Sequence, residues 1–178
     1  MTWLEQDAQM SARLRVAEKP GLLRQLAIFF GHSGDSWFWG IGLALAMWRL
    51  SPPWPQIAQA LFIGIALTAI VVMAIKFSVR RARPEGEWGR IYRKADPHSF
   101  PSGHAARAAM LAVLGLALGP AWFGALLAVW APLVGLARVA TGLHFISDVV
   151  VGWLLGILMG WVTLQVLGLD AVAAWLPF

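Results

Sequence analysis

Long uncharged stretches alternate with short polar breaks along most of the chain. Five stretches carry almost no charge, at about residues 36–50, 56–77, 103–119, 120–136 and 149–167. Each of them is close to the roughly 20 apolar residues that a helix needs to cross a bilayer. Prolines, glycines or charged residues separate one stretch from the next. The pattern predicts an all-α fold, a polytopic transmembrane helical bundle of about five spans.

The N-terminal residues follow a different pattern. Residues 3–18 place Trp3, Met10, Leu14 and Ala17 on one helical stripe and charged residues elsewhere. This pattern fits an amphipathic helix in the membrane interface, and a short helix packed on a neighbour is the alternative. We expect a second interfacial piece before residue 36, where Ser33 or Asp35 can cap the next helix. The chain thus divides into an interfacial region, 1–35, and a transmembrane domain, 36–178.

Composition supports a membrane protein and narrows its chemistry. Apolar residues make up 59% of the chain and charged residues only 13%, compared with about 25% charged in soluble domains. The net charge of +5 favours anionic lipid headgroups or an anionic substrate. Nucleic acid is a poor partner, because the basic residues cluster with the apolar spans. The absence of cysteine excludes disulfides and thiolate chemistry, so four histidines must carry any imidazole chemistry.

Ionisable residues at the edges of spans need an explanation, because they are costly in lipid and usually face a polar cavity. Seven stand there: Lys76, Arg83, His104, Arg107, Arg138, His144 and Asp148. If successive spans alternate in direction, these span ends lie on one membrane face. Lys76, Arg83 and Arg138 together suit a tetrahedral oxyanion, although each alone is more typical of a side chain that reaches the headgroups.

Two short motifs lie at the same span ends. Pro101-Ser102-Gly103-His104 precedes an apolar helix, whose free N–H groups favour an anion, and a plain turn with an N-cap is the alternative. His144 and Asp148 are four residues apart and share one face if the helix has begun by His144, so the carboxylate can hold one imidazole tautomer. With no cysteine and no acidic cluster, we predict no metal site.

Together, these residues resemble the three signatures of the type 2 phosphatidic acid phosphatases. The chain matches Lys-x6-Arg-Pro from Lys76 to Pro84, then Pro-Ser-Gly-His, then Arg-x5-His-x3-Asp from Arg138 to Asp148. The resemblance implies a cofactor-independent lipid phosphatase of the small bacterial type. It makes His144 the nucleophile that forms a phosphohistidine, Asp148 its orienting carboxylate and His104 the acid. It assigns phosphate binding to Lys76, Arg83, Ser102, Gly103 and Arg138.

The chain departs from the family pattern in two respects. The third signature commonly begins Ser-Arg, whereas this chain has Ala137-Arg138. Familiar members have six spans, so the number of spans, five or six, stays open. Several charged residues fall outside the matched positions. We interpret Arg80, Arg81 and Arg107 as headgroup or cavity residues, and Glu85, Glu87, Asp96 and His98 as a solvated loop.

A site at span ends can receive a phosphate headgroup while the lipid tail stays in the bilayer. Polyprenyl diphosphate, phosphatidic acid and phosphatidylglycerophosphate all fit, and the resemblance to small bacterial members favours the first, in the inner (plasma) membrane. The Lys and Arg distribution predicts a cytoplasmic active site, but many bacterial relatives act on the outer face. A lipid phosphotransferase, a transporter or proton relay, and a protein that has lost catalysis remain as alternatives. The oligomeric state stays open.

Overall fold

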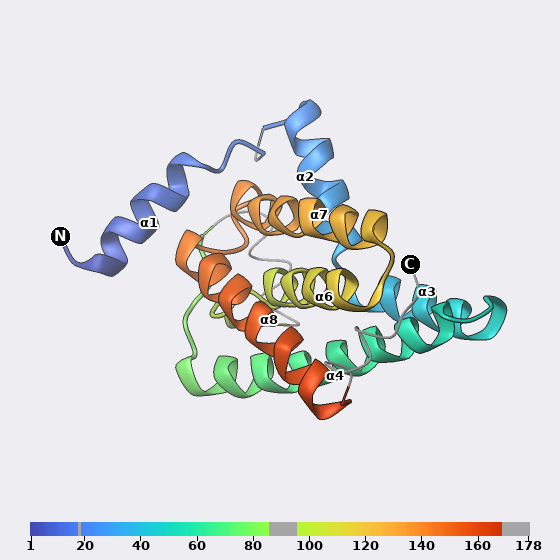
Figure 1. Ribbon diagram of the computed structural model, residues 1–178. Coiled ribbons are helices and arrows are strands. Elements are labelled where there is room, and N and C mark those ends of the chain that lie inside the picture. Colours follow the sequence, from blue (N-terminus) through green and yellow to red (C-terminus); the bar gives the residue numbers. More distant parts are fainter. Residues whose placement is uncertain (18, 86–95, 169–178) are drawn as a thin grey trace.

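The computed structural model describes residues 1–17, 19–85 and 96–168 (Figure 1). Seven helices make up this part: α1 (Trp3–Arg13), α2 (Leu22–Ser33), α3 (Ser36–Arg49), α4 (Trp54–Val79), α6 (Gly103–Leu118), α7 (Ala121–Ala140) and α8 (Ile146–Val166). A helix occurs at each of the five apolar stretches, and the predicted all-α fold is confirmed.

The helices differ in whether they are long enough to cross a membrane. In the described residues, α4, α7 and α8 are long and apolar enough to do so. Helix α6 has 16 residues and α3 has 14, which at 1.5 Å per residue gives about 24 and 21 Å. A bilayer core is about 30 Å thick. The predicted count of five spans is therefore not confirmed.

Helix α6 lies at the centre of the bundle, between α4, α7 and α8 (Figure 1). Its contact with α8 is close because glycines at four-residue intervals, Gly152, Gly156 and Gly160, form the facing stripe of α8. A Cβ atom at Gly152 would lie 2.7 Å from the carbonyl oxygen of Ser102, and one at Gly156 would collide with that of Ala106. Small residues that let helix backbones meet are typical of membrane bundles. This contact brings the first turns of α6 and α8 together.

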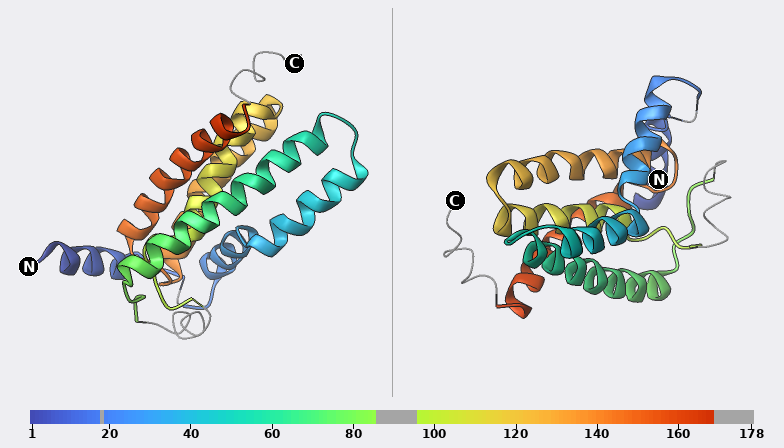
Figure 2. Two further views of the ribbon diagram at one scale, coloured as in Figure 1. Left: turned by 90° about the horizontal axis from the view of Figure 1, so that it is seen from below. Right: turned by 90° about the vertical axis from the view of Figure 1, so that its right-hand side faces the viewer.

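The N-terminal helices surround the same bundle. Helix α2 packs on α7, α3 packs on α4, and α1 contacts the beginning of α8. In Figure 2, α1 projects sideways from the end of the bundle where α4 finishes and α8 starts. The helix predicted over residues 3–18 ends at Arg13. Of its predicted apolar stripe, Trp3, Met10 and Leu14 are exposed, and Ala17, beyond the end of α1, is fully buried. Helix α1 thus packs on a neighbour and also presents apolar side chains outward.

Candidate active site

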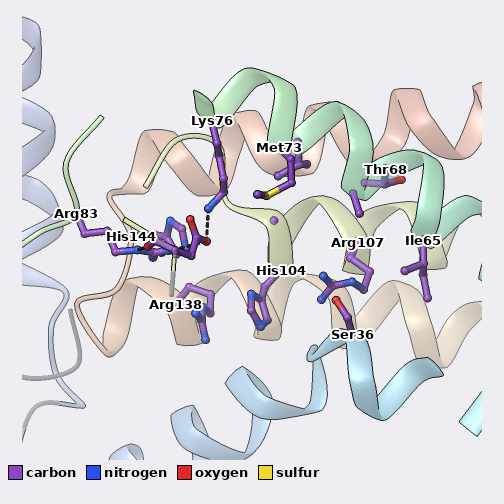
Figure 3. A pocket seen from close by; sticks show the side chains of 14 residues that line it. Ser36, Ile65, Thr68, Met73, Lys76, Arg83, His104, Arg107, Arg138 and His144 are labelled. Carbon is purple, nitrogen blue, oxygen red and sulfur yellow. Dashed lines mark hydrogen bonds and ion pairs between the residues drawn. The ribbon is translucent and has the colours of Figure 1, made fainter. Parts of the chain in front are cut away.

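A cavity of about 330 Å³ lies at the end of the bundle where α4 ends and α6 begins (Figure 3). Six of the eight predicted site residues line it: Lys76, Arg83, Gly103, His104, Arg138 and His144. The other two, Ser102 and Asp148, are fully buried and are not among the lining residues. The structure therefore brings the three separated motifs to one place.

Ser102 and Asp148 join the two helices behind the cavity. Ser102 is the N-cap of α6, and its hydroxyl accepts a hydrogen bond of 3.5 Å from the backbone N–H of Ala105. Its own N–H donates to the backbone carbonyl of Asp148 at 2.9 Å. The cap leaves Gly103 as the first residue of α6 at the cavity wall. Phosphate binding by Ser102 stays a prediction.

Lys76 and Arg83 share one carboxylate at the cavity wall. Lys76 Nζ lies 2.5 Å from Asp96 Oδ2, and Arg83 Nη2 lies 2.7 Å from the same oxygen. Burial alone would raise the pKa of Asp96, but the hydrogen bond and charge of Lys76 and the charge of Arg83 lower it. The expectation that Asp96 belongs to a solvated loop was wrong, because two buried cations require a counter-charge. Glu85 is exposed as expected, and Glu87 lies outside the described residues.

His144 is buried and accepts a hydrogen bond on the cavity side. Arg83 Nη1 lies 3.1 Å from His144 Nε2, and a guanidinium can only donate. Nε2 is therefore the unprotonated nitrogen and Nδ1 carries the proton. Burial, together with the charges of Arg83 and Arg138, lowers the pKa of His144 well below its ordinary value. The imidazole is neutral, with an electron pair on the nitrogen that faces the cavity.

Asp148 lies beside the protonated nitrogen of His144. Its Oδ2 is 3.6 Å from His144 Nδ1, within ion-pair range but longer than a hydrogen bond. Helix α8 begins only at Ile146, so the condition that the helix starts by His144 is not met. Asp148 Oδ2 instead accepts from the N–H of Phe145 at 2.9 Å, and Oδ1 accepts from Arg81 at 2.8 Å. Arg81, expected as a headgroup or cavity residue, lies behind His144.

His104 has a carboxylate partner that its local sequence does not indicate. His104 Nε2 lies 2.8 Å from Asp35 Oδ1, and His32 Nδ1 lies 3.0 Å from Asp35 Oδ2. Burial would raise the pKa of Asp35, but the two imidazoles lower it, so the carboxylate is ionised. Asp35 was predicted only as a possible helix cap, and although it is the N-cap residue of α3, its side chain makes no cap hydrogen bond.

Two further arginines reach this cavity. Arg138, in the last turn of α7, is 2% exposed. Arg107, one turn after His104, also lines the cavity, in agreement with its interpretation as a headgroup or cavity residue, and donates to the carbonyl oxygen of Gly34. The cavity thus combines four cationic side chains with two imidazoles, a combination suited to an anion with several oxygens.

Comparison with known proteins identifies the family. A family model described as the PAP2 superfamily matches residues 57–170, which include every predicted site residue. The chain belongs to the PAP2 superfamily. The match includes the whole of α6, α7 and α8, the helices that carry or adjoin both histidines. Membership agrees with the resemblance drawn from the three signatures.

Two characterised PAP2 relatives are lipid phosphatases by name. An undecaprenyl-diphosphatase of Sulfolobus acidocaldarius is 29% identical over 147 residues, covering 81% of this chain and 70% of that protein. A lipid A 1-phosphatase of Porphyromonas gingivalis is 32% identical over 149 residues, covering 82% of this chain. That second alignment spans only 28% of the Porphyromonas protein.

Solved PAP2 structures share the fold. LpxE of Aquifex aeolicus has a TM-score of 0.68 and 27% identity, over 86% of this chain and 92% of that one. A transmembrane phosphatidylglycerolphosphate phosphatase of Bacillus subtilis has a TM-score of 0.72 over 90% and 83% of the two chains. At 23% identity, this second likeness concerns the fold alone. With three apolar helices of spanning length among its described residues, this PAP2 protein is an integral membrane protein.

Proposed function

We propose that this protein hydrolyses a phosphomonoester or diphosphate on a membrane lipid. The observation that carries the proposal is the two-part lining of the cavity. Lys76, Arg83, Arg138 and the two imidazoles line one end of the cavity, and Ile65 lies at the other end beside Arg107 (Figure 3). Ala69 and Val72 of α4 also belong to the lining. Met73, also in the lining, is 43% exposed on α4. A phosphate fits the first part while an apolar tail follows α4 to the outer surface of the bundle.

The residues support a two-step transfer through a phosphohistidine. Arg83 releases its hydrogen bond to His144 Nε2, Nε2 attacks phosphorus, the P–N bond forms, and the bond from phosphorus to the lipid oxygen breaks. His104, in its imidazolium form, gives the proton of Nδ1 to that oxygen and becomes neutral, while its Nε2 keeps the contact with Asp35. A water molecule then attacks phosphorus, His104 takes the proton from the water, and the P–N bond breaks to release phosphate. Both imidazoles return to their starting states.

The cations stabilise the charge on the transferred phosphoryl group. Lys76, Arg83 and Arg138 are buried, so they act in a medium of low dielectric constant where each contact is strong. The backbone N–H of Gly103, at the N-terminus of α6, is placed to add a further donor. In the structure, the carboxylate of Asp96 accepts hydrogen bonds from Lys76 and Arg83. A bound phosphate that uses both donors must displace this carboxylate.

The names of the relatives and the shape of the cavity support this substrate class. By their names, the two sequence relatives act on undecaprenyl diphosphate and on lipid A, and the Bacillus protein of similar fold acts on phosphatidylglycerolphosphate. The apolar part of the cavity here suits a hydrocarbon tail. We favour a polyprenyl diphosphate over phosphatidic acid and phosphatidylglycerophosphate, in a bacterial inner (plasma) membrane. Within the chain, residues 36–178 form the phosphatase domain and residues 1–35 an interfacial region.

Phosphate release from purified protein tests the proposal. The protein is incubated in detergent with EDTA and each of the three lipids, beside His144→Ala and the control His98→Ala, whose side chain contacts Phe77. We expect chelator-resistant release by the wild type and the control, and a loss of at least about 10,000-fold in His144→Ala. Full activity of a folded His144→Ala protein would refute the mechanism. Phosphate found on a second lipid instead of in solution would indicate a phosphotransferase.

A further inference from the structure

Helix α1 turns its polar side chains toward the protein. Asp7 and Ser11 are 8% and 1% exposed, whereas Trp3 and Met10 are 64% and 58% exposed. A helix packed on a protein in water shows the opposite pattern. The contact of α1 with the beginning of α8 therefore includes the polar side chains of Asp7 and Ser11.

Those contacts supply the N-terminal cap of α8. The residue at the cap position is Phe145, whose side chain has no oxygen to accept from the first free N–H groups of the helix. The N–H of Ile146 donates instead to Ser11 Oγ at 2.9 Å, and the N–H of Ser147 donates to Asp7 Oδ1 at 3.2 Å. A helix 140 residues earlier in the chain thus completes the first turn of α8.

The same carboxylate also holds the arginine that contacts Asp148. Arg81 Nη2 lies 2.7 Å from Asp7 Oδ2, and Arg81 Nη1 lies 2.8 Å from Asp148 Oδ1. The guanidinium carbon is 4.0 Å from the centre of the Phe145 ring. Burial would raise the pKa of Asp7, but hydrogen bonds from Ser147 and Arg81 lower it, so Asp7 is ionised at neutral pH. Arg81 therefore joins two carboxylates, one in α1 and one beside His144.

We infer that Asp7 is a positioning residue for the proposed nucleophile. It fixes Arg81 and the first turn of α8, and these fix Asp148 against the protonated nitrogen of His144. The inference rests on the proposed function, because it assigns Asp7 to the step carried out at His144. Asp7 is not among the residues that line the cavity. Its removal therefore slows the chemical step and leaves substrate binding unchanged.

The first test is the isosteric variant Asp7→Asn. We expect kcat to fall about 10- to 100-fold, the range typical of outer partners that orient catalytic groups, with KM within about twofold of wild type. The matched control is Glu5→Gln, which removes the same charge from an exposed position of α1 that contacts Thr2. The control keeps the wild-type kcat. An Asp7→Asn protein with wild-type kcat would overturn the inference.

A double-mutant cycle separates positioning from general support of the fold. If Asp7 acts through Asp148, then Asp7→Asn causes no further loss of kcat in an Asp148→Asn background. Residues that act as one unit are non-additive in this way. If the loss of kcat in the double variant equals the product of the two single losses, Asp7 acts by another route and the inference fails.

Hydrogen exchange gives a readout that does not depend on turnover. In Asp7→Asn we expect faster amide exchange in peptides containing Ile146 and Ser147, with exchange in α4 unchanged. Unchanged exchange at these two amides, or faster exchange throughout the chain, would contradict the inference. A wild-type protein inactive on every lipid would refute the proposed function instead, and the exchange measurement would still decide whether Asp7 fixes the start of α8.

Discussion

The two histidines of the cavity have carboxylate partners of opposite character. The carboxylate beside His144, Asp148, is fully buried and receives hydrogen bonds from Arg81 and from the N–H of Phe145. The carboxylate beside His104, Asp35, also contacts His32, whose side chain is 50% exposed. The pair of His144 and Asp148 is enclosed by protein. The pair of His104 and Asp35 is connected to the surface through His32.

This difference matches the two chemical tasks in the proposed reaction. A nucleophilic imidazole must keep one tautomer, and an enclosed carboxylate with fixed donors holds that tautomer. An acid must lose its proton in the first step and regain one in the second. Asp35 contacts both His104 and the half-exposed His32, and we expect the proton of His104 to exchange with water by this route. The surroundings of each carboxylate thus suit the role that the resemblance implied for its histidine.

The variant Asp148→Asn gives the strongest test of the difference between the two carboxylates. An amide beside Nδ1 no longer favours the tautomer that leaves Nε2 unprotonated, so we expect kcat to fall on the order of 1,000- to 10,000-fold. The fold should persist, because an asparagine keeps the size of the side chain. Turnover in detergent and a thermal unfolding curve measure the two quantities. Turnover close to the wild-type rate would show that Asp148 does not orient His144.

His104→Ala is expected to have the next largest effect, about 100- to 10,000-fold. The loss should depend on the leaving group, because only a poor leaving group needs a proton. We expect the largest loss with an alkyl phosphate ester and the smallest with an aryl phosphate ester of similar apolar size. Equal losses with both substrates would contradict the assignment of His104 as the acid.

Asp35→Asn gives the smallest expected loss, about 10- to 100-fold in kcat. It should show the same leaving-group dependence as His104→Ala, because Asp35 acts through that imidazole. His98→Ala again serves as the control with wild-type kinetics. A loss that is the same for every leaving group would assign Asp35 to the α2–α3 turn and not to proton transfer.

Local spacing explains which parts of the site could be predicted. The signatures from Lys76 to Asp148 place the cations and imidazoles at helix ends, and alternation of helix direction brings those ends together. Asp148 follows His144 by four residues, so its proximity is a local property of the chain. The five apolar stretches were found for the same reason, since the composition of a helix in lipid is visible in any short window.

Contacts between distant residues explain what could not be predicted. Asp35 lies 69 residues from His104, and only the packing of α2 and α3 on the bundle brings them together. Asp96 sits in a polar segment that is typical of a solvated loop, and nothing local indicates that its carboxylate turns inward to Lys76.

The backbone contact between α6 and α8 has a consequence for work in different membranes. Bilayers differ in thickness, and helices adapt to them mainly by tilting. Because Gly152, Gly156 and Gly160 place α8 directly against α6, we expect the two helices to tilt as a pair. The spacing of the residues at their first turns then stays constant while the surrounding helices adjust. We therefore expect His104 and His144 to keep their spacing in thin and in thick bilayers.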